Sequence, residues 1–211
     1  MVVSSMTRKE IAGHLLSELR NNKNRIERKA GIVAKKMLKA GKKVHAYQQR
    51  VGSNTLFTIY IYGIDDEGID YAIGCWFHSD KGLCWATVGP YDVNFYSAHF
   101  FQRYAERYLM KSMSVQDAAR EFYREYQVTM ARNTEEIAVG IYKAQLPLHN
   151  GGLALGFNDS TNNLVVYNTY VSPDMLGARQ INDIEDDREL NEALRSLNSS
   201  EYRLIVEAMK L

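Results

Sequence analysis

The chain has 211 residues, a formal net charge of +1, 45% hydrophobic residues and 24% charged residues. This composition is typical of a folded globular protein and excludes an intrinsically disordered chain. The N-terminus has no apolar segment before its first charges, and no apolar run approaches the length of a membrane span. We therefore expect a cytoplasmic protein that has no membrane partner.

Charge is distributed unevenly between the N-terminal segment and the rest of the chain. Residues 1–50 contain 13 Lys and Arg against 3 Glu and so carry +10, which leaves −9 for residues 51–211. Such an imbalance marks either a segment that binds nucleic acid or a basic segment that folds onto an acidic part of the same protein, here the stretch "DIEDDRE". We interpret residues 1–50 as a basic helical arm and residues 51–211 as an α+β globular domain.

Two short amphipathic helices are expected between Thr7 and about Ala40. Apolar residues recur every four positions from Ile11 to Leu19, and a similar pattern resumes after the polar stretch "NNKN". Thr7 is a candidate N-cap, because Glu10 follows three residues later as in a capping box. The candidate nucleic-acid-binding residues of the arm are Arg25, Arg28, Lys29, Lys35, Lys36, Lys42 and Lys43.

A block of strands rich in β-branched and aromatic residues follows the arm, with turn sequences between the strands. The pattern predicts an antiparallel meander. Cys75 and Cys84 lie on adjacent predicted strands, and pairing of Phe77 with Cys84 would place the two cysteines on opposite sheet faces. We interpret both as reduced core residues. The strands are expected at 55–63, 69–79, 83–90 and 92–96.

Two helices and a second block of strands come next. One helix is expected from Ser97, as its N-cap, to about Met110, and a second from the "SMS" stretch to about Arg132. One or two short helices are expected to end the chain. The predicted fold class is α+β: antiparallel strand blocks packed on central helices, joined in one bent sheet, with the basic helical arm in front. The later strands are expected at 137–147, 151–157 and 162–171.

The stretch "YSAHFFQRYAERYL" places His99, Arg103 and Arg107 at a spacing of four on one side of a predicted helix, opposite its apolar stripe. A histidine transfers protons near neutral pH, and arginine donors match phosphate oxygens. These groups would suffice for RNA cleavage without a metal, which needs an acid or base and a clamp on the phosphate. The alternative is a solvated cationic helix face, with Arg103 paired to Glu106.

The order "H-x-x-x-R-x-x-x-R" on a helix, a second helix, and Gly-containing strands ending in "NTYV" resembles the compact toxin ribonucleases of the RelE/ParE-like and BrnT-like kind. The similarity covers about residues 96–171. It implies a metal-independent ribonuclease that acts on RNA in preference to DNA. It also implies that His99, Arg103 and Arg107 are the catalytic motif residues, and that Thr169 and Tyr170 present polar groups to them from the last strand.

No metal site or cofactor is expected, because the five histidines are scattered and neither H-E-x-x-H nor Cys-x-x-Cys spacing occurs. Two classes of function stay open. The first is a metal-independent RNA-binding or RNA-cleaving protein of toxin-like type, in which cleavage requires His99. The second is a non-enzymatic interaction module whose basic arm binds nucleic acid or the acidic surface of a protein partner.

Overall fold

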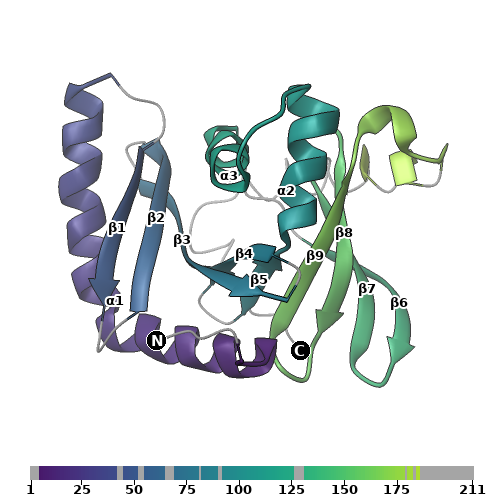
Figure 1. The fold of residues 1–211 in the computed structure, drawn as a ribbon, viewed down its shortest axis with the longest axis horizontal. Coiled ribbons are helices and arrows are strands. Elements are labelled where there is room, and N and C mark those ends of the chain that lie inside the picture. Colours follow the sequence, from purple (N-terminus) through teal and green to yellow (C-terminus); the bar gives the residue numbers. More distant parts are fainter. Residues whose placement is uncertain are drawn as a thin grey trace.

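The computed structural model describes residues 5–41, 45–51, 55–64, 69–80, 82–89, 92–125, 131–178, 180–182 and 184–185. In these residues nine strands form one sheet, with one long helix on one face and two shorter helices on the other (Figure 1). The predicted α+β class is confirmed. None of the helices in the described part combines the length and the apolar character needed to cross a membrane.

The strands are arranged in the order β1-β2-β3-β4-β5-β9-β8-β7-β6, and all neighbours are antiparallel except β5 and β9. This parallel pair joins the two predicted strand blocks into one sheet. The elements are α1 (Arg8–Lys39), β1 (His45–Val51), β2 (Thr55–Ile64), β3 (Ile69–Ser79), β4 (Gly82–Val88), β5 (Val93–Tyr96), α2 (Ala98–Tyr104), the π-helical turn η1 (Ala105–Leu109), α3 (Val115–Arg124), β6 (Arg132–Ala138), β7 (Ile141–Pro147), β8 (Leu153–Asp159), β9 (Leu164–Val171) and the 3₁₀ turn η2 (Pro173–Met175).

Side chains alternate along each strand and supply two separate cores. In β4, Cys84 and Ala86 face α1, whereas Trp85 faces α2 and α3. The core under α1 is built mainly from aliphatic residues and phenylalanines, and it also contains Met37 and the two cysteines. The core under α2 and α3 is aromatic, and in it Trp85 donates its indole N–H to the hydroxyl of Tyr123 over 2.9 Å.

The helix α1 begins at the predicted capping box. Thr7 and Glu10 each accept a hydrogen bond from the other's backbone N–H. The prediction of two short helices is wrong, because α1 runs without a break from Arg8 to Lys39. Within the polar stretch Asn22 donates its side-chain amide to the carbonyl of Glu18, a contact of the kind that bends helices rather than ending them. Figure 1 shows that the two halves of α1 run in different directions along the sheet.

The buried side of α1 belongs to the core of the sheet. Ile11, Leu15 and Ile26 are at most 2% exposed and pack against side chains of the strands. The helix is therefore held on the sheet along its length. The expected division between residues 50 and 51 falls within β1, which pairs with β2.

The two cysteines lie on the same sheet face. Phe77 pairs with Cys84 as expected, but directly paired residues point to one face, and Cys75 shares that face with Phe77. The expectation of opposite faces is wrong. Both thiols are free and buried, and burial raises the pKa of Cys75 to about 11.

The edge strands β1 and β6 were not predicted. Six of the seven residues of β6 are exposed, and its polar sequence "RNTEEIA" has no apolar alternation. The predicted strand 137–147 is instead the end of β6, a turn at Gly140 with φ of 72°, and β7. The second central helix, α3, ends at Arg124 rather than near Arg132, where β6 begins. The expected C-terminal helices lie outside the described residues.

Candidate functional site

The strip of His99, Arg103 and Arg107 lies on the outer side of α2 and η1. The helix begins at Ser97, whose hydroxyl oxygen accepts from the N–H of Phe100 at 3.1 Å, so the predicted cap is confirmed. The same hydroxyl donates to the backbone carbonyl of Asn168 on β9 at 2.9 Å. The start of the helix is thereby tied to the strand that was expected to face the strip.

Protein groups hold the two arginines of the strip. Arg103 donates to the carboxylate of Glu106 at 2.8 Å, and Arg107 donates to the backbone carbonyl of Tyr170 at 2.7 Å. His99 is exposed. Because a helix rises about 1.5 Å per residue, the backbones of His99 and Arg107 are separated by about 12 Å. The structure therefore brings Arg107 to Tyr170 but leaves His99 apart from both.

The side chain of Tyr170 does not face the strip. Tyr170 is 0% exposed, and its ring centroid lies 5.4 Å from that of Tyr104 in the aromatic core. Burial raises the pKa of Tyr170 to about 12, and the nearby amide of Asn150 partly offsets this effect. Thr169 is half-buried and alternates to the other side of β9. Of the two residues, Tyr170 contacts the strip through its backbone carbonyl.

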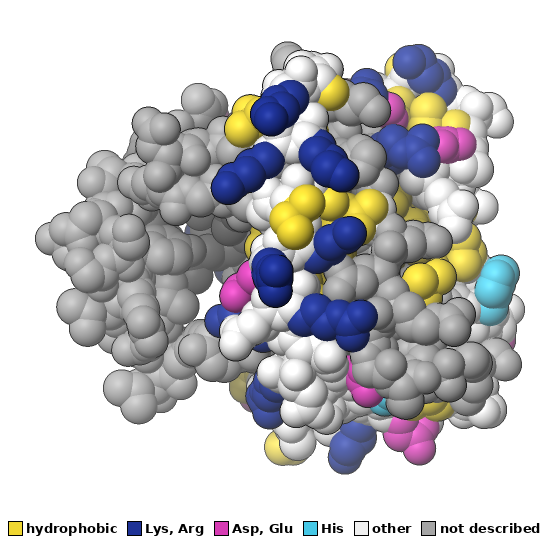
Figure 2. Space-filling model, turned by 90° about the vertical axis from the view of Figure 1, so that its left-hand side faces the viewer, with side chains coloured by type: hydrophobic (Ala, Val, Ile, Leu, Met, Phe, Trp, Pro, Cys, Tyr) yellow, Lys and Arg dark blue, Asp and Glu magenta, His cyan; other side chains and the backbone are white. Residues whose placement is uncertain are grey.

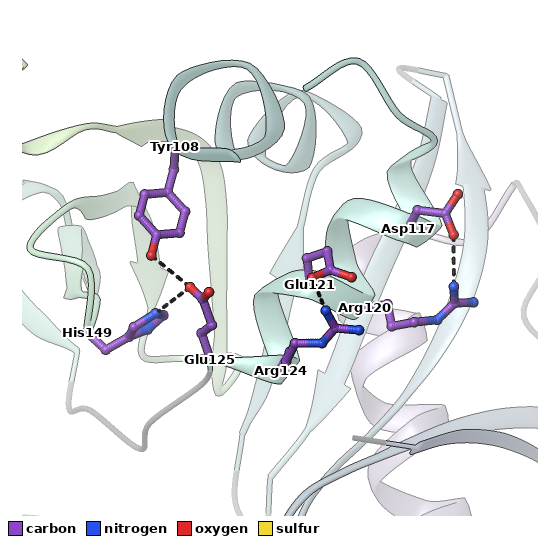
Figure 3. A network of polar contacts seen from close by, with 7 residues as sticks. All are labelled: Tyr108, Asp117, Arg120, Glu121, Arg124, Glu125 and His149. Carbon is purple, nitrogen blue, oxygen red and sulfur yellow. Dashed lines mark hydrogen bonds and ion pairs between the residues drawn. The ribbon is translucent and has the colours of Figure 1, made fainter. Parts of the chain in front are cut away.

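A second cluster of titratable side chains brings together three elements that are distant in sequence. Glu125, at the end of α3, accepts from the hydroxyl of Tyr108 on η1 at 2.8 Å, and its carboxylate lies 3.1 Å from Nε2 of His149 in the β7–β8 turn (Figure 3). The side chain of His149 is 15% exposed and that of Glu125 is 40% exposed. A carboxylate fixes the orientation of an imidazole beside it, and such a pair can transfer protons.

Buried hydroxyl groups surround this cluster. The rings of Tyr104 and Tyr108 are 5.3 Å apart, and burial and then Glu125 raise the pKa of Tyr104. Within the described part, the hydroxyls of Tyr104 and Tyr170 and the amide nitrogen of Asn150 are buried without a hydrogen bond of normal geometry. Buried polar groups are usually paired, so their concentration beside an acid–base pair distinguishes this region from an ordinary core.

Sequence reasoning missed Glu125 and His149. They are 24 residues apart, one in an ordinary amphipathic helix and the other in a turn. No short motif joins them, because only the packing of α3 against the β7–β8 turn brings them together. The available signals were weak: a histidine beside turn residues, and the π-helical turn at 105–109, a feature often found at functional sites.

The outer side of α1 carries a large excess of positive charge. Its ten Lys and Arg residues are all exposed, against three Glu in the same helix. Figure 2 shows dark blue side chains spread along the side that α1 covers. Lys23 pairs with Glu27 at 3.8 Å. Lys42 and Lys43 lie outside the described residues. We call five exposed cations of its second half the basic face: Arg25, Arg28, Lys29, Lys35 and Lys36.

Comparison with known proteins assigns no family to this chain. No family model matches it, and neither a curated protein nor a solved structure does so. Among the residues that the structure describes, no group of three or more His, Cys, Asp or Glu could hold a metal ion. Inferences about function therefore depend on three features: the basic face, the strip, and the cluster of Tyr108, Glu125 and His149, which we call the Glu125 cluster.

Proposed function

We propose that this protein binds nucleic acid, RNA in preference to DNA, through the basic face of α1. The observation that carries the proposal is the row of exposed cations with no carboxylate partner among the described residues. Lys and Arg that contact phosphates release counterions, and this release supplies much of the affinity for nucleic acid. The choice of RNA follows from the resemblance of residues 96–171 to toxin ribonucleases.

The buried side of α1 supports this function by fixing the basic face in place. Ile26, Ala30 and Ala34 are at most 2% exposed and recur every four residues on the side opposite the cations. The cations from Arg25 to Lys36 therefore extend over about 16 Å of a helix that is already anchored. An anchored surface loses less conformational freedom on binding than a flexible arm does.

Removal of charge from the basic face tests the proposal. A variant with four substitutions to Gln, at Arg25, Arg28, Lys35 and Lys36, keeps residues that favour helix formation. Its Kd for a single-stranded RNA of 20 nucleotides should rise at least about tenfold, because four phosphate contacts are lost. Fluorescence anisotropy at one fixed salt concentration measures the Kd, and circular dichroism checks the fold.

A matched control removes the same charge elsewhere, by substitutions to Gln at Lys111, Arg120, Arg124 and Lys143. These residues are exposed, and three of them are paired with carboxylates. The control should bind RNA within about threefold of wild type, since already neutralised cations contribute little. Equal weakening by both variants would contradict the proposal. Binding of polyglutamate without binding of RNA would favour the interaction module.

A second candidate function is metal-independent RNA cleavage, which the Glu125 cluster favours. In this reaction a base takes the proton of the 2′-hydroxyl, the 2′-oxygen attacks the adjacent phosphorus, and the departing 5′-oxygen takes a proton from an acid. A 2′,3′-cyclic phosphate and a 5′-hydroxyl result. The acid–base role is better supported for His149 than for His99, because the carboxylate of Glu125 lies beside the imidazole of His149 and orients it.

Cleavage of a mixed RNA pool in EDTA tests the second candidate. His149→Ala should lower the rate by a factor of about 10²–10⁴, the usual contribution of general acid–base catalysis. His99→Ala serves as the comparison and should cut at nearly the wild-type rate. The reverse ranking would return the acid–base role to His99 and the strip. Uncut RNA with the wild-type protein would reject cleavage and leave the binding proposal in place.

A further inference from the structure

A groove of about 460 Å³ separates the first half of α1 from the turn between β8 and β9. In Figure 1 this part of α1 passes beneath the start of β9. The volume lies within the range of about 300–1,000 Å³ that is typical of small-molecule sites. The groove is separate from the Glu125 cluster and from the basic face on the second half of the helix.

We propose that this groove binds a phosphate-bearing nucleotide, with Lys9 and Arg20 as its cationic contacts. The inference deepens the proposed function and rests on it, because it names where one nucleotide unit of a bound RNA would lie. The same chemistry would hold a free mononucleotide. The experiment below distinguishes these two sources.

The charges of the groove match a phosphate. Lys9 and Arg20 both line it and are exposed, and no Asp or Glu is among the described lining residues. Arginine and lysine donors stabilise phosphate oxygens. The carboxylate of Asp159 lies behind the wall, where it accepts hydrogen bonds from the backbone N–H of Asn162 at 3.1 Å and from its side chain at 2.7 Å.

Gly13 keeps the groove open at its centre. Lys9, Gly13, Ser17 and Arg20 recur at steps of three or four residues and so share one side of α1. A Cβ placed on Gly13 would meet no atom within 4 Å, so the space in front of it is free. Glycine inside a helix lowers its stability, and its position at the middle of the lining leaves room for a bound ring or sugar. Leu16 adds a half-buried apolar contact beside it.

The opposite wall is held in one conformation. Asn163 adopts a left-handed backbone with φ of 52°, and its carbonyl accepts a hydrogen bond from Val93 at the start of β5. Asn162 is fixed on Asp159. The polar side chains of Thr161 and Asn163 therefore project from a turn that is already ordered, which lowers the cost of binding a ligand.

Gly13→Leu is the sharpest test, because it fills the groove without removing a charge. Binding of AMP and of adenosine to the full chain is measured by calorimetry. We expect AMP to bind at least about tenfold more tightly than adenosine, and Gly13→Leu or Arg20→Gln to weaken AMP at least about tenfold. The melting temperature of Gly13→Leu should equal or exceed that of wild type, since leucine favours the helix more than glycine does.

The control for this test is the double substitution to Gln at Lys111 and Lys143, two exposed residues outside the groove and the basic face, which should leave AMP binding unchanged. Absence of AMP binding by wild type, or AMP binding that Gly13→Leu leaves intact, would overturn the proposal. Its failure is distinguishable from failure of the proposed function. RNA binding that is lost in the basic-face variant, together with AMP binding that Gly13→Leu leaves intact, would keep the proposed RNA binding and reject the groove.

RNA oligonucleotides with and without a 5′-phosphate separate the two sources of the nucleotide. Both carry the same internal phosphates, so only the chain end differs. Tighter binding of the 5′-phosphorylated RNA, lost in Gly13→Leu, would place an RNA end in the groove. Equal binding of both RNAs, together with AMP binding that Gly13→Leu abolishes, would assign the groove to a free nucleotide.

Discussion

The helices on the two faces of the sheet differ in how far their charged residues are paired. On α2 and α3, arginines are paired with carboxylates three residues away, as in Arg103 with Glu106, Arg120 with Asp117 and Arg124 with Glu121. Figure 3 shows two of these pairs on α3. On α1, ten exposed cations accompany three Glu. The first face is locally neutral, whereas α1 presents an excess of positive charge to the solvent.

The cores beneath these helices also differ in how many polar aromatic side chains they bury. Under α1, the described residues include no fully buried tyrosine or tryptophan, whereas six buried tyrosines and Trp85 lie under α2 and α3. On the α1 side the charged groups therefore lie at the surface, and they can be substituted without changing the core. On the other side the polar groups are part of the core, so changes to them also affect stability.

The largest effect is expected where the aromatic core is emptied. Phe122 is 0% exposed and packs against Tyr96, Phe100 and Tyr104. Phe122→Ala should lower the free energy of unfolding by about 3–5 kcal/mol, because it removes apolar contacts and leaves a cavity. Urea denaturation measures the change. A loss below about 1 kcal/mol would show that α3 is not packed on the sheet as described.

A pair of tyrosine substitutions sharpens the contrast within this core. The hydroxyl of Tyr123 accepts from Trp85 at 2.9 Å and lies 2.9 Å from that of Thr87, whereas the hydroxyl of Tyr104 is buried without a hydrogen bond. Tyr123→Phe should cost about 1–3 kcal/mol, because it leaves the indole N–H unpaired. Tyr104→Phe should be neutral or stabilising. Equal costs in thermal denaturation would mean that Tyr104 has a polar partner.

Alkaline pH should destabilise the protein through buried groups on both faces of the sheet. Burial raises the pKa of Tyr60 from 10.0 to about 12 and that of Cys75 from 9.0 to about 11. The folded state keeps these protons where the unfolded chain loses them, so stability is full below pH 9 and falls as the pH rises above it. In urea titrations Cys75→Ala should flatten this fall between about pH 9 and 11, and Tyr60→Phe should flatten it between about pH 10 and 12. A free energy of unfolding that increases as the pH rises above 9 would contradict the raised pKa values of these groups.

The interior strands could be predicted from sequence, but the edges could not. Strands such as β4 alternate apolar residues or are rich in β-branched and aromatic side chains, and their turns contain Asp and Gly. The edge strands β1 and β6 have little apolar pattern because one side of an edge strand faces no neighbour and polar residues there prevent association. Capping residues were predictable at Thr7 and Ser97, since a cap is a local hydrogen bond.

Local sequence patterns could predict neither the continuous helix α1 nor the Glu125 cluster. The "NNKN" stretch has a low helix propensity, but packing of Ile26 and its neighbours on the sheet keeps α1 continuous through it. The contact of His149 with Glu125 depends on tertiary packing, so no spacing in the sequence predicts it. The groove at Gly13 likewise needs the β8–β9 turn as its second wall.

The salt dependence of RNA binding tests the central claim most directly. The logarithm of the binding constant should fall linearly with the logarithm of salt concentration, and the slope counts phosphate contacts. The variant with Gln at Arg25, Arg28, Lys35 and Lys36 should have a slope shallower by about 2.8 than wild type, because each contact to a single strand contributes about 0.7. An unchanged slope in this variant, with the fold intact, would contradict the assignment of RNA binding to α1.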